Sequence, residues 1–173
     1  HCLPKTAWSD FIKNANVVNV FTGEIIPADV ALYEDVIIGV GAYSCENEID
    51  AEGGYLTPGF IDAHVHIESS MVIPSQYGRL VIPRGVATVI ADPHEIANVC
   101  GEAGLDFMYN DRSPLRTYYM LPSCAPATPF DSSGAILDGA ECKKLWEKGN
   151  FLGLGEMMNY PGVIGGDEDT LSK

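Results

Sequence analysis

The sequence predicts an α/β fold in which a small β-rich segment precedes the first half of a TIM-like (β/α)8 barrel. Residues 16–57 contain short strand-like runs separated by turn residues, and from Pro58 onward a strand, a loop and a helix alternate. The expected strand ends lie roughly 30 residues apart, the length of one βα unit. We therefore expect two regions: residues 1–57 as a β-sandwich-type flanking segment, and residues 58–173 as four βα units.

The N-terminal segment has the features of a small antiparallel β-unit. Its first run, Asn16–Phe21, is rich in valine and is followed by Thr22 and Gly23, which favour a turn. No helical periodicity is evident before Pro58. In order, the strands expected here are 16–21, 30–33, 36–40, 49–51 and 55–56.

The second segment is expected to form a parallel sheet covered by helices. Val86–Ala91 is wholly apolar, which is typical of a strand buried on both faces. Four units in succession predict half of a barrel, although an open doubly wound sheet has the same local pattern. The strands expected are 60–66, 86–91, 117–121 and 151–155, and the helices are 74–82, 95–110 and 138–148.

The charge distribution disfavours several classes of partner. The chain has 173 residues with 24 acidic and 10 basic side chains, a net charge of -14, and no basic residue between Lys13 and Arg79. Such a surface repels phosphate backbones and anionic headgroups, so we expect neither nucleic acid nor membrane as a partner. No apolar run is long enough to span a bilayer, and no leader is visible. The five cysteines contain no CxxC pair, which favours free thiols and a cytoplasmic location.

A pair of histidines gives the first chemical signal. His64 and His66 are two residues apart on an expected strand, so their imidazoles point to the same side and can reach one cation. They end the first parallel strand, where barrel active sites are built. An isolated pair is equally compatible with structural histidines. With His94, however, three of the four histidines lie where strands end, which favours a metal.

Glu156 gives the second signal. It follows Leu152–Gly155, an expected strand whose glycines allow backbone or ligand to approach closely. It therefore lies on the rim where the histidine pair is expected, and its two oxygens can bridge two divalent ions. A solvated glutamate at a strand end is the alternative reading.

Asp92–Glu95, the run Asp-Pro-His-Glu, gives the third signal. Pro93 ends the second expected strand and places three titratable groups, Asp92, His94 and Glu95, at the rim. Such groups can orient ligands, transfer protons or bind another ion. The same four residues also fit a helix start, with Asp92 as the cap and Glu95 three residues later. The two readings are compatible.

Four segments together resemble a known family. PGFIDAHVHIESSM, residues 58–71, is similar to the start of an amidohydrolase-superfamily barrel. Three later segments narrow the resemblance to adenine deaminases, and the similarity extends from about residue 14 to residue 163. These segments are ADPHEIANVCG at 91–101, LPSCAPATPF at 121–130 and GLGEMMNYPGV at 153–163.

The resemblance implies hydrolytic deamination of adenine to hypoxanthine and ammonia by a metal-activated hydroxide. It implies two divalent metal ions, with manganese or iron as the usual choice. His64 and His66 match the metal-binding pair of this family, and Glu156 matches the carboxylate that bridges the ions. Asp92, His94 and Glu95 occupy a motif near the metals and are the catalytic candidates. Two ions about 3.5–4 Å apart would bring the pKa of a shared water near neutrality.

The sequence also departs from this family. Its members are longer and take further metal ligands from later barrel strands, whereas no histidine follows Glu156 here. We therefore expect an N-terminal fragment that is inactive alone. The open strand edges of a half-barrel favour pairing with a second copy, so a homo-oligomer is expected. Two alternatives stay open: another amidohydrolase acting on cyclic amides, and a non-catalytic half-barrel that serves binding or assembly.

Overall fold

The computed structural model describes residues 9–34, 36–43 and 47–173 of the chain. It divides into two compact units, residues 1–58 and residues 59–173. Cys2 and Cys45 lie outside the described residues, while Cys100, Cys124 and Cys142 are free thiols. Within the described ranges, no helix combines the length and the apolar character that a membrane span requires.

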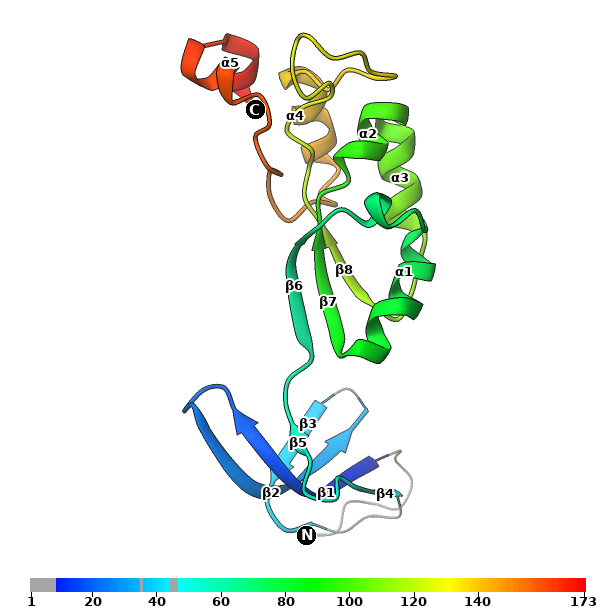
Figure 1. Cartoon of the computed structure of the whole chain (residues 1–173), viewed down its shortest axis with the longest axis vertical. Helices are drawn as coiled ribbons and strands as arrows, with labels where there is room; N and C mark the ends of the chain where they lie inside the picture. Colours follow the sequence, from blue (N-terminus) through cyan, green and yellow to red (C-terminus); the bar gives the residue numbers. More distant parts are fainter. Residues whose placement is uncertain (1–8, 35, 44–46) are drawn as a thin grey trace. The chain divides into compact units, whose positions relative to one another are not determined.

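The first unit is a five-stranded sheet (Figure 1). The strands β1, β2 and β3 pair antiparallel, whereas β4 and β5 both pair with β1 in parallel. The expectation of a purely antiparallel unit is therefore wrong, because the chain after β3 returns to run alongside β1. The strands are β1 Ser9–Asn19, β2 Glu24–Tyr33, β3 Val36–Val40, β4 Asn47–Asp50 and β5 Tyr55–Leu56.

Strand β2 is longer than the sequence suggested. It begins at Glu24 and passes through Pro27, a residue that argues against a central strand. The strand β3 pairs only with Val30–Tyr33, so among the described residues Pro27 lies where β2 has a neighbour on one side alone. Because no described strand pairs with β2 on that side of Pro27, the lack of a proline N–H breaks no hydrogen bond there.

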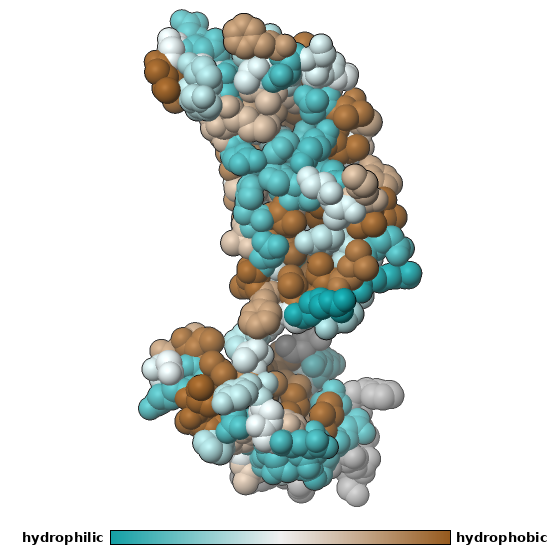
Figure 2. Space-filling view, in the orientation of Figure 1, coloured by the Kyte–Doolittle hydropathy of each residue, from teal (hydrophilic) through white to brown (hydrophobic). Residues whose placement is uncertain are grey.

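The first unit buries few side chains. Phe11, Ala15, Val30 and Ala31 are the buried hydrophobic residues among its described positions. Many other hydrophobic side chains reach the surface, which carries visible apolar patches (Figure 2). The exposed ones on β2 and β3 are Ile25, Ile26, Tyr33, Val36, Ile37, Ile38 and Val40.

The second unit contains a three-stranded parallel sheet in the order β6-β7-β8, with helices in the connections (Figure 1). The strands are β6 Phe60–Val65, β7 Val86–Ala91 and β8 Arg116–Tyr119. The longer helices are α1 Pro74–Val81, α2 His94–Cys100, α3 Glu102–Asn110 and α4 Gly139–Glu147. The short ones are η1 Ile67–Ser70, η2 Ile82–Arg84, α5 Tyr160–Gly165 and α6 Glu168–Ser172.

Two expected elements differ in the structure. The helix expected over 95–110 is two helices, because Gly101 between them takes φ 57° and ψ -139°, which only glycine adopts readily. The fourth strand, 151–155, is reduced to one parallel bridge between Leu121 and Leu154. Gly153 and Gly155 nevertheless exchange backbone hydrogen bonds with Leu121, so this segment runs beside the end of the third strand.

The core of the second unit consists of two clusters. One surrounds the sheet and includes Val89 and Ala91 of β7, which are fully buried. The other packs α4 against the loop after β8 through Leu145 and Leu121. These clusters fix the carboxyl ends of the strands, from which the candidate site is built. The remaining members are Ile67, Met108, Leu115 and Tyr119 in the first, and Ala97, Leu105, Ala125, Leu137 and Cys142 in the second.

Candidate metal centre

The histidine pair lies at a bulge in β6. Asp62 pairs with Val89 and Val65 pairs with Ala91, so β6 spends one more residue than β7 between these two points. The Asp62 carboxylate accepts a hydrogen bond from the His64 backbone N–H at 3.3 Å, inside the bulge. A bulge redirects nearby side chains, and His64 lies within this one.

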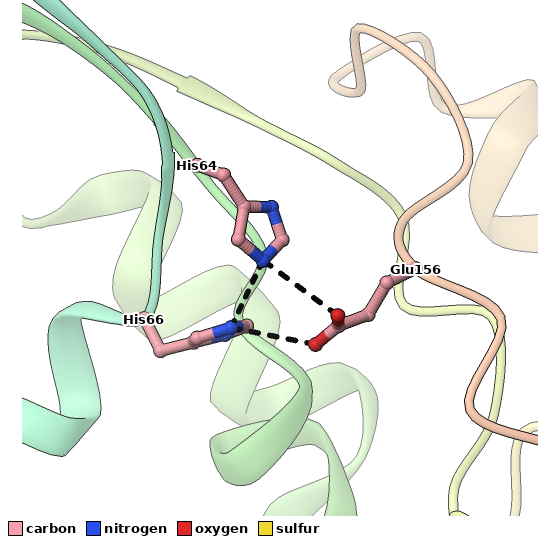
Figure 3. A group of neighbouring side chains, drawn as sticks. All are labelled: His64, His66 and Glu156. Atoms are coloured by element: carbon pink, nitrogen blue, oxygen red, sulfur yellow. Dashed lines mark hydrogen bonds and ion pairs between the residues drawn. The ribbon is translucent and has the colours of Figure 1, made fainter.

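His64, His66 and Glu156 point toward one another (Figure 3). His64 Nε2 lies 3.1 Å from His66 Nε2 and 3.8 Å from Glu156 Oε2. His66 Nε2 lies 3.4 Å from Glu156 Oε1. The structure thus brings together the three residues that the sequence singled out as metal ligands; that they bind metal stays a prediction.

The His66 ring is oriented by the backbone of the next strand. Its Nδ1 lies 2.8 Å from the Asp92 carbonyl oxygen. A carbonyl oxygen only accepts, so Nδ1 donates, and the neutral ring then presents the lone pair of Nε2 toward His64 and Glu156. Metal-binding histidines usually donate their other ring N–H in this way.

Glu156 is fixed through its backbone. Its N–H donates to Asp92 Oδ2 at 2.9 Å, and its carbonyl oxygen accepts from the hydroxyl of Ser123. Gly155 passes so close to Asp92 that a Cβ there would lie 2.4 Å from Oδ2. Asp92 and Ser123 are almost completely buried, so this anchoring is shielded from water. Ser123 was not singled out as a functional residue in the sequence, and it lies 33 residues from its partner.

Residues of Asp92–Glu95, the third signal in the sequence, lie close to the carboxylate of Glu156. His94 Nδ1 lies 3.7 Å from Asp92 Oδ1 and 3.6 Å from Glu156 Oε1. The adjacent Asp92 carboxylate raises the pKa of His94, burial opposes this, and the charges of Glu95 and Glu156 add to the increase. At 3.7 Å the Asp92 contact is longer than a hydrogen bond, so we attribute its effect to charge attraction.

Glu95 is held from another side. Ser69 Oγ donates to Glu95 Oε1 at 2.8 Å, while Glu95 Oε2 lies 3.6 Å from His66 Nδ1 and 3.7 Å from His94 Nε2. A second glutamate, Glu68, accepts from the Ile96 N–H at 3.2 Å, and burial is the main cause that raises its pKa. Ser69 and Glu68 were missed in the sequence, although both lie within three residues of His66.

The donor set fits a divalent ion. Among the described residues, Asp92 Oδ1, His94 Nδ1 and Glu95 Oε2 are buried atoms without a hydrogen-bond partner. Leaving such groups unpaired costs about 1–3 kcal/mol each, and a cation would satisfy them. Imidazole nitrogens together with carboxylate oxygens suit manganese, iron and zinc alike.

These features match one family of proteins. The amidohydrolase family matches residues 55–164, and the chain belongs to it. It is 56% identical to adenine deaminase 2 of Desulfotalea psychrophila and 53% identical to adenine deaminase of Clostridium acetobutylicum, each over 164 residues. Those matches cover 94% of this chain but only 28% and 29% of the two relatives. The predicted likeness to adenine deaminases is confirmed, over less than a third of their length.

Two solved structures support a TIM-barrel-like fold for this chain. The L-hydantoinase of Arthrobacter aurescens matches with a TM-score of 0.59 and 17% identity, over 84% of this chain and 32% of its own. A dihydroorotase matches with a TM-score of 0.54 and 15% identity, over 84% of this chain and 41% of its own. At these identities the likeness concerns the fold alone.

Proposed function

We propose that this chain supplies the metal-binding part of a hydrolase that deaminates adenine to hypoxanthine and ammonia. The observation that carries the proposal is the convergence of His64, His66 and Glu156, which lie within reach of one ion. The 56% identity to a protein named adenine deaminase 2 supports adenine as the small-molecule partner.

In this proposal, His64, His66 and Glu156 hold a divalent ion at a two-metal site, with manganese or iron as the expected metal. An ion bound there would lower the pKa of a water toward neutrality and would stabilise developing negative charge. The Asp92 carbonyl holds the His66 ring in the tautomer that such binding needs. The half-exposed carboxylate of Glu156 leaves the site open to a substrate from the solvent side.

Asp92, His94 and Glu95 are the proposed catalytic groups. Deamination requires that a proton reach the departing amino nitrogen, which a positioned carboxylate or imidazole can deliver. Glu95 suits this task because Ser69 fixes one of its oxygens at 2.8 Å while the other faces the two imidazoles. Asp92 and His94 lie beside Glu156 and so touch the metal region itself.

The architecture of the whole enzyme is also a proposal. We assign residues 58–173 to the first four βα units of a TIM-like barrel and residues 1–57 to a sandwich-type flanking segment. The chain spans less than a third of its adenine deaminase relatives, so adenine turnover is proposed to need side chains outside these 173 residues. The edges of the sheet favour a homo-oligomer, and the net charge of -14 fits a cytoplasmic enzyme without nucleic acid or membrane partners.

A chimera tests the proposal. The matching 28% of the Desulfotalea psychrophila relative would be replaced by this chain, and both ammonia release from adenine and ring opening of hydantoin to its N-carbamoyl acid would be measured. We expect ammonia release from adenine without ring opening of hydantoin, and loss of that release in chimeras that carry His64→Asn or Glu156→Gln. Ring opening of hydantoin instead would favour a cyclic amidase. A folded chimera without activity, whose metal content is insensitive to His64→Asn, would favour a non-catalytic module.

A further inference from the structure

We propose that Glu68 and Ser69 are a pair of positioning residues that hold the first turn of α2, and with it Glu95, in place for the reaction. The proposal deepens the function proposed above and rests on it, because Glu95 is one of the proposed catalytic groups. Both residues lie in η1, the short turn that follows His66. Glu68 fixes the backbone of α2, and Ser69 fixes the side chain of Glu95.

The helix α2 has no cap of its own. The first N–H groups of a helix lack partners within it, and the residue just before the helix usually accepts from one of them. In α2 that position is occupied by Pro93, whose side chain has no acceptor, and no side-chain cap bond is present. Asp92, which the sequence suggested as the cap, instead accepts from the Glu156 N–H at 2.9 Å. A partner for this helix end must therefore come from elsewhere in the chain.

Glu68 supplies that partner. Its Oε1 accepts a hydrogen bond at 3.2 Å from the N–H of Ile96, the third residue of α2, although 28 residues separate the two in the sequence. A negative charge at this end of a helix is also favoured by the helix dipole. Glu68 thus takes the place of the missing cap and fixes the turn that carries His94 and Glu95.

Ser69 acts on the neighbouring residue of the same turn. Its hydroxyl donates to Glu95 Oε1 at 2.8 Å. The other oxygen, Oε2, is buried without a hydrogen-bond partner among the described residues and lies 3.6 Å from His66 Nδ1 and 3.7 Å from His94 Nε2. One oxygen of Glu95 is therefore held, so that the other faces the imidazoles.

The turn η1 is a firm support for this pair. Ile67 is 0% exposed and belongs to the core cluster that surrounds the sheet, and Ile96 of α2 packs against the same cluster. The turn closes through a bond of 2.9 Å from the Met71 N–H to the Glu68 carbonyl. The two contacts with α2 thus start from a segment that is itself anchored in the core.

A merely structural role fits these two residues less well. Glu68 Oε2 is buried and has no hydrogen-bond partner among the described residues, which lowers stability rather than raising it. Ser69 is exposed, so water can replace its bond to Glu95 at little cost in stability. Both contacts therefore contribute more to the position of Glu95 than to the stability of the fold.

Steady-state kinetics with adenine in the chimera described above test the inference. Glu68→Ala and Ser69→Ala should each lower kcat about tenfold or more while KM and manganese content change little, since a misplaced catalytic group slows the chemical step. Glu68→Gln keeps an accepting oxygen and Ser69→Thr keeps the hydroxyl, so both should retain most of kcat. Ser70→Ala is the matched control, because that hydroxyl donates to the Ile67 carbonyl within η1.

A double-mutant cycle shows whether Ser69 acts through Glu95. In chimeras that already carry Glu95→Gln, Ser69→Ala should cause no further loss of kcat. A further tenfold loss in that background would overturn the inference, as would conservative variants as damaging as the alanine variants. Ser69 is exposed, so Ser69→Ala carries this test even where Glu68→Ala does not fold.

Hydrogen exchange separates the inference from the proposed function. Exchange of the peptide that spans residues 92–100 would be followed by mass spectrometry in the unmodified chimera, in Glu68→Ala and in Ser70→Ala. Loss of the cap should speed exchange in the first turn of α2 about fivefold in Glu68→Ala alone. Equal exchange in the two variants would overturn the role of Glu68, whether or not adenine is turned over. A folded, unmodified chimera without adenine turnover would instead overturn the proposed function.

Discussion

The two ends of the parallel strands in the second unit are built on opposite principles. At the carboxyl ends, His66 and Asp92 bring polar atoms together, and some of these atoms are buried without a hydrogen bond. At the amino ends, Phe60 and Val86 meet through ordinary packing and a backbone bond from the Phe60 N–H to the Gly85 carbonyl at 2.8 Å. The contrast supports the proposal that one end serves a ligand and the other stability, the division expected of barrel enzymes.

Glycines at the two ends show the same division. Gly155 is needed because the Asp92 carboxylate occupies the space of a side chain. Gly85 is needed because its backbone has φ +89°, a conformation that other residues rarely adopt. One glycine makes room for a functional group, and the other ends η2 so that the chain can enter β7.

The largest effect is expected from Glu156→Gln, which alters the only carboxylate among the three proposed metal ligands. The substitution removes a negative charge and one carboxylate oxygen. Mn²⁺ affinity should therefore fall by about 100-fold or more, which exceeds the usual loss when a residue that only orients a metal ligand is changed. The side chain is 46% exposed, so thermal unfolding should change little. Equilibrium dialysis and a melting curve check both parts. Unchanged Mn²⁺ affinity would contradict the proposal that the carboxyl ends of the strands bind a ligand.

Gly155→Ala should affect both the site and the fold. The new Cβ would lie 2.4 Å from Asp92 Oδ2, so either the backbone at Glu156 or the Asp92 carboxylate must move. We expect a loss of roughly 1–3 kcal/mol in the free energy of unfolding, typical of overpacking. We also expect about tenfold weaker Mn²⁺ binding, as for other changes behind a ligand. Urea unfolding and dialysis measure the two; a stable variant with normal affinity would contradict the close contact.

Gly85→Ala is the matched change at the amino ends. Its left-handed backbone should cost about 1–2 kcal/mol of stability, since Cβ crowds the following carbonyl there. Mn²⁺ affinity should be unchanged because the residue lies at the opposite end of β7 from Asp92. Urea unfolding and dialysis measure these effects. A loss of Mn²⁺ affinity as large as that of Gly155→Ala would contradict the difference between the two ends of the strands.

The smallest effect is expected from Glu102→Gln on the surface of α3. Lys148 and Lys144 lower the pKa of Glu102 to about 2, and both lysines form ion pairs with it. Because the folded pKa is lowered, its contribution to stability is present above the unfolded pKa near 4.5 and is lost as pH falls toward 2. Urea unfolding at pH 7 should show a small deficit in Glu102→Gln that vanishes at pH 2 and weakens with salt. A deficit that grows on acidification would contradict this assignment.

The sequence predicted well those features that are encoded locally. β7 spans Val86–Ala91 as expected, because an uninterrupted apolar run is bounded there by Gly85 and by Pro93. The two-residue spacing of His64 and His66 predicts that their side chains lie on the same side of the strand. The structure brings Glu156 next to them, as predicted. Their role as ligands awaits the metal measurements.

The features that the sequence did not predict depend on contacts across long separations. Asp92 and Glu156 are 64 residues apart, and their hydrogen bond leaves no mark in either local pattern. The same is true of Ser123. The break of the expected helix at Gly101 was missed because an isolated glycine is tolerated inside many helices, and here only the backbone angles reveal the interruption.

The bulge in β6 has a consequence for how this strand can vary among relatives. Because one extra residue lies between Asp62 and Val65, excision of Ala63 would restore a regular ladder but rotate His64 to the opposite face. Point substitutions within the strand should therefore be absorbed far more readily than a change in its length. In a deep mutational library, positions 63 and 65 should tolerate several amino-acid exchanges, whereas every single-codon deletion within 62–66 should be rejected.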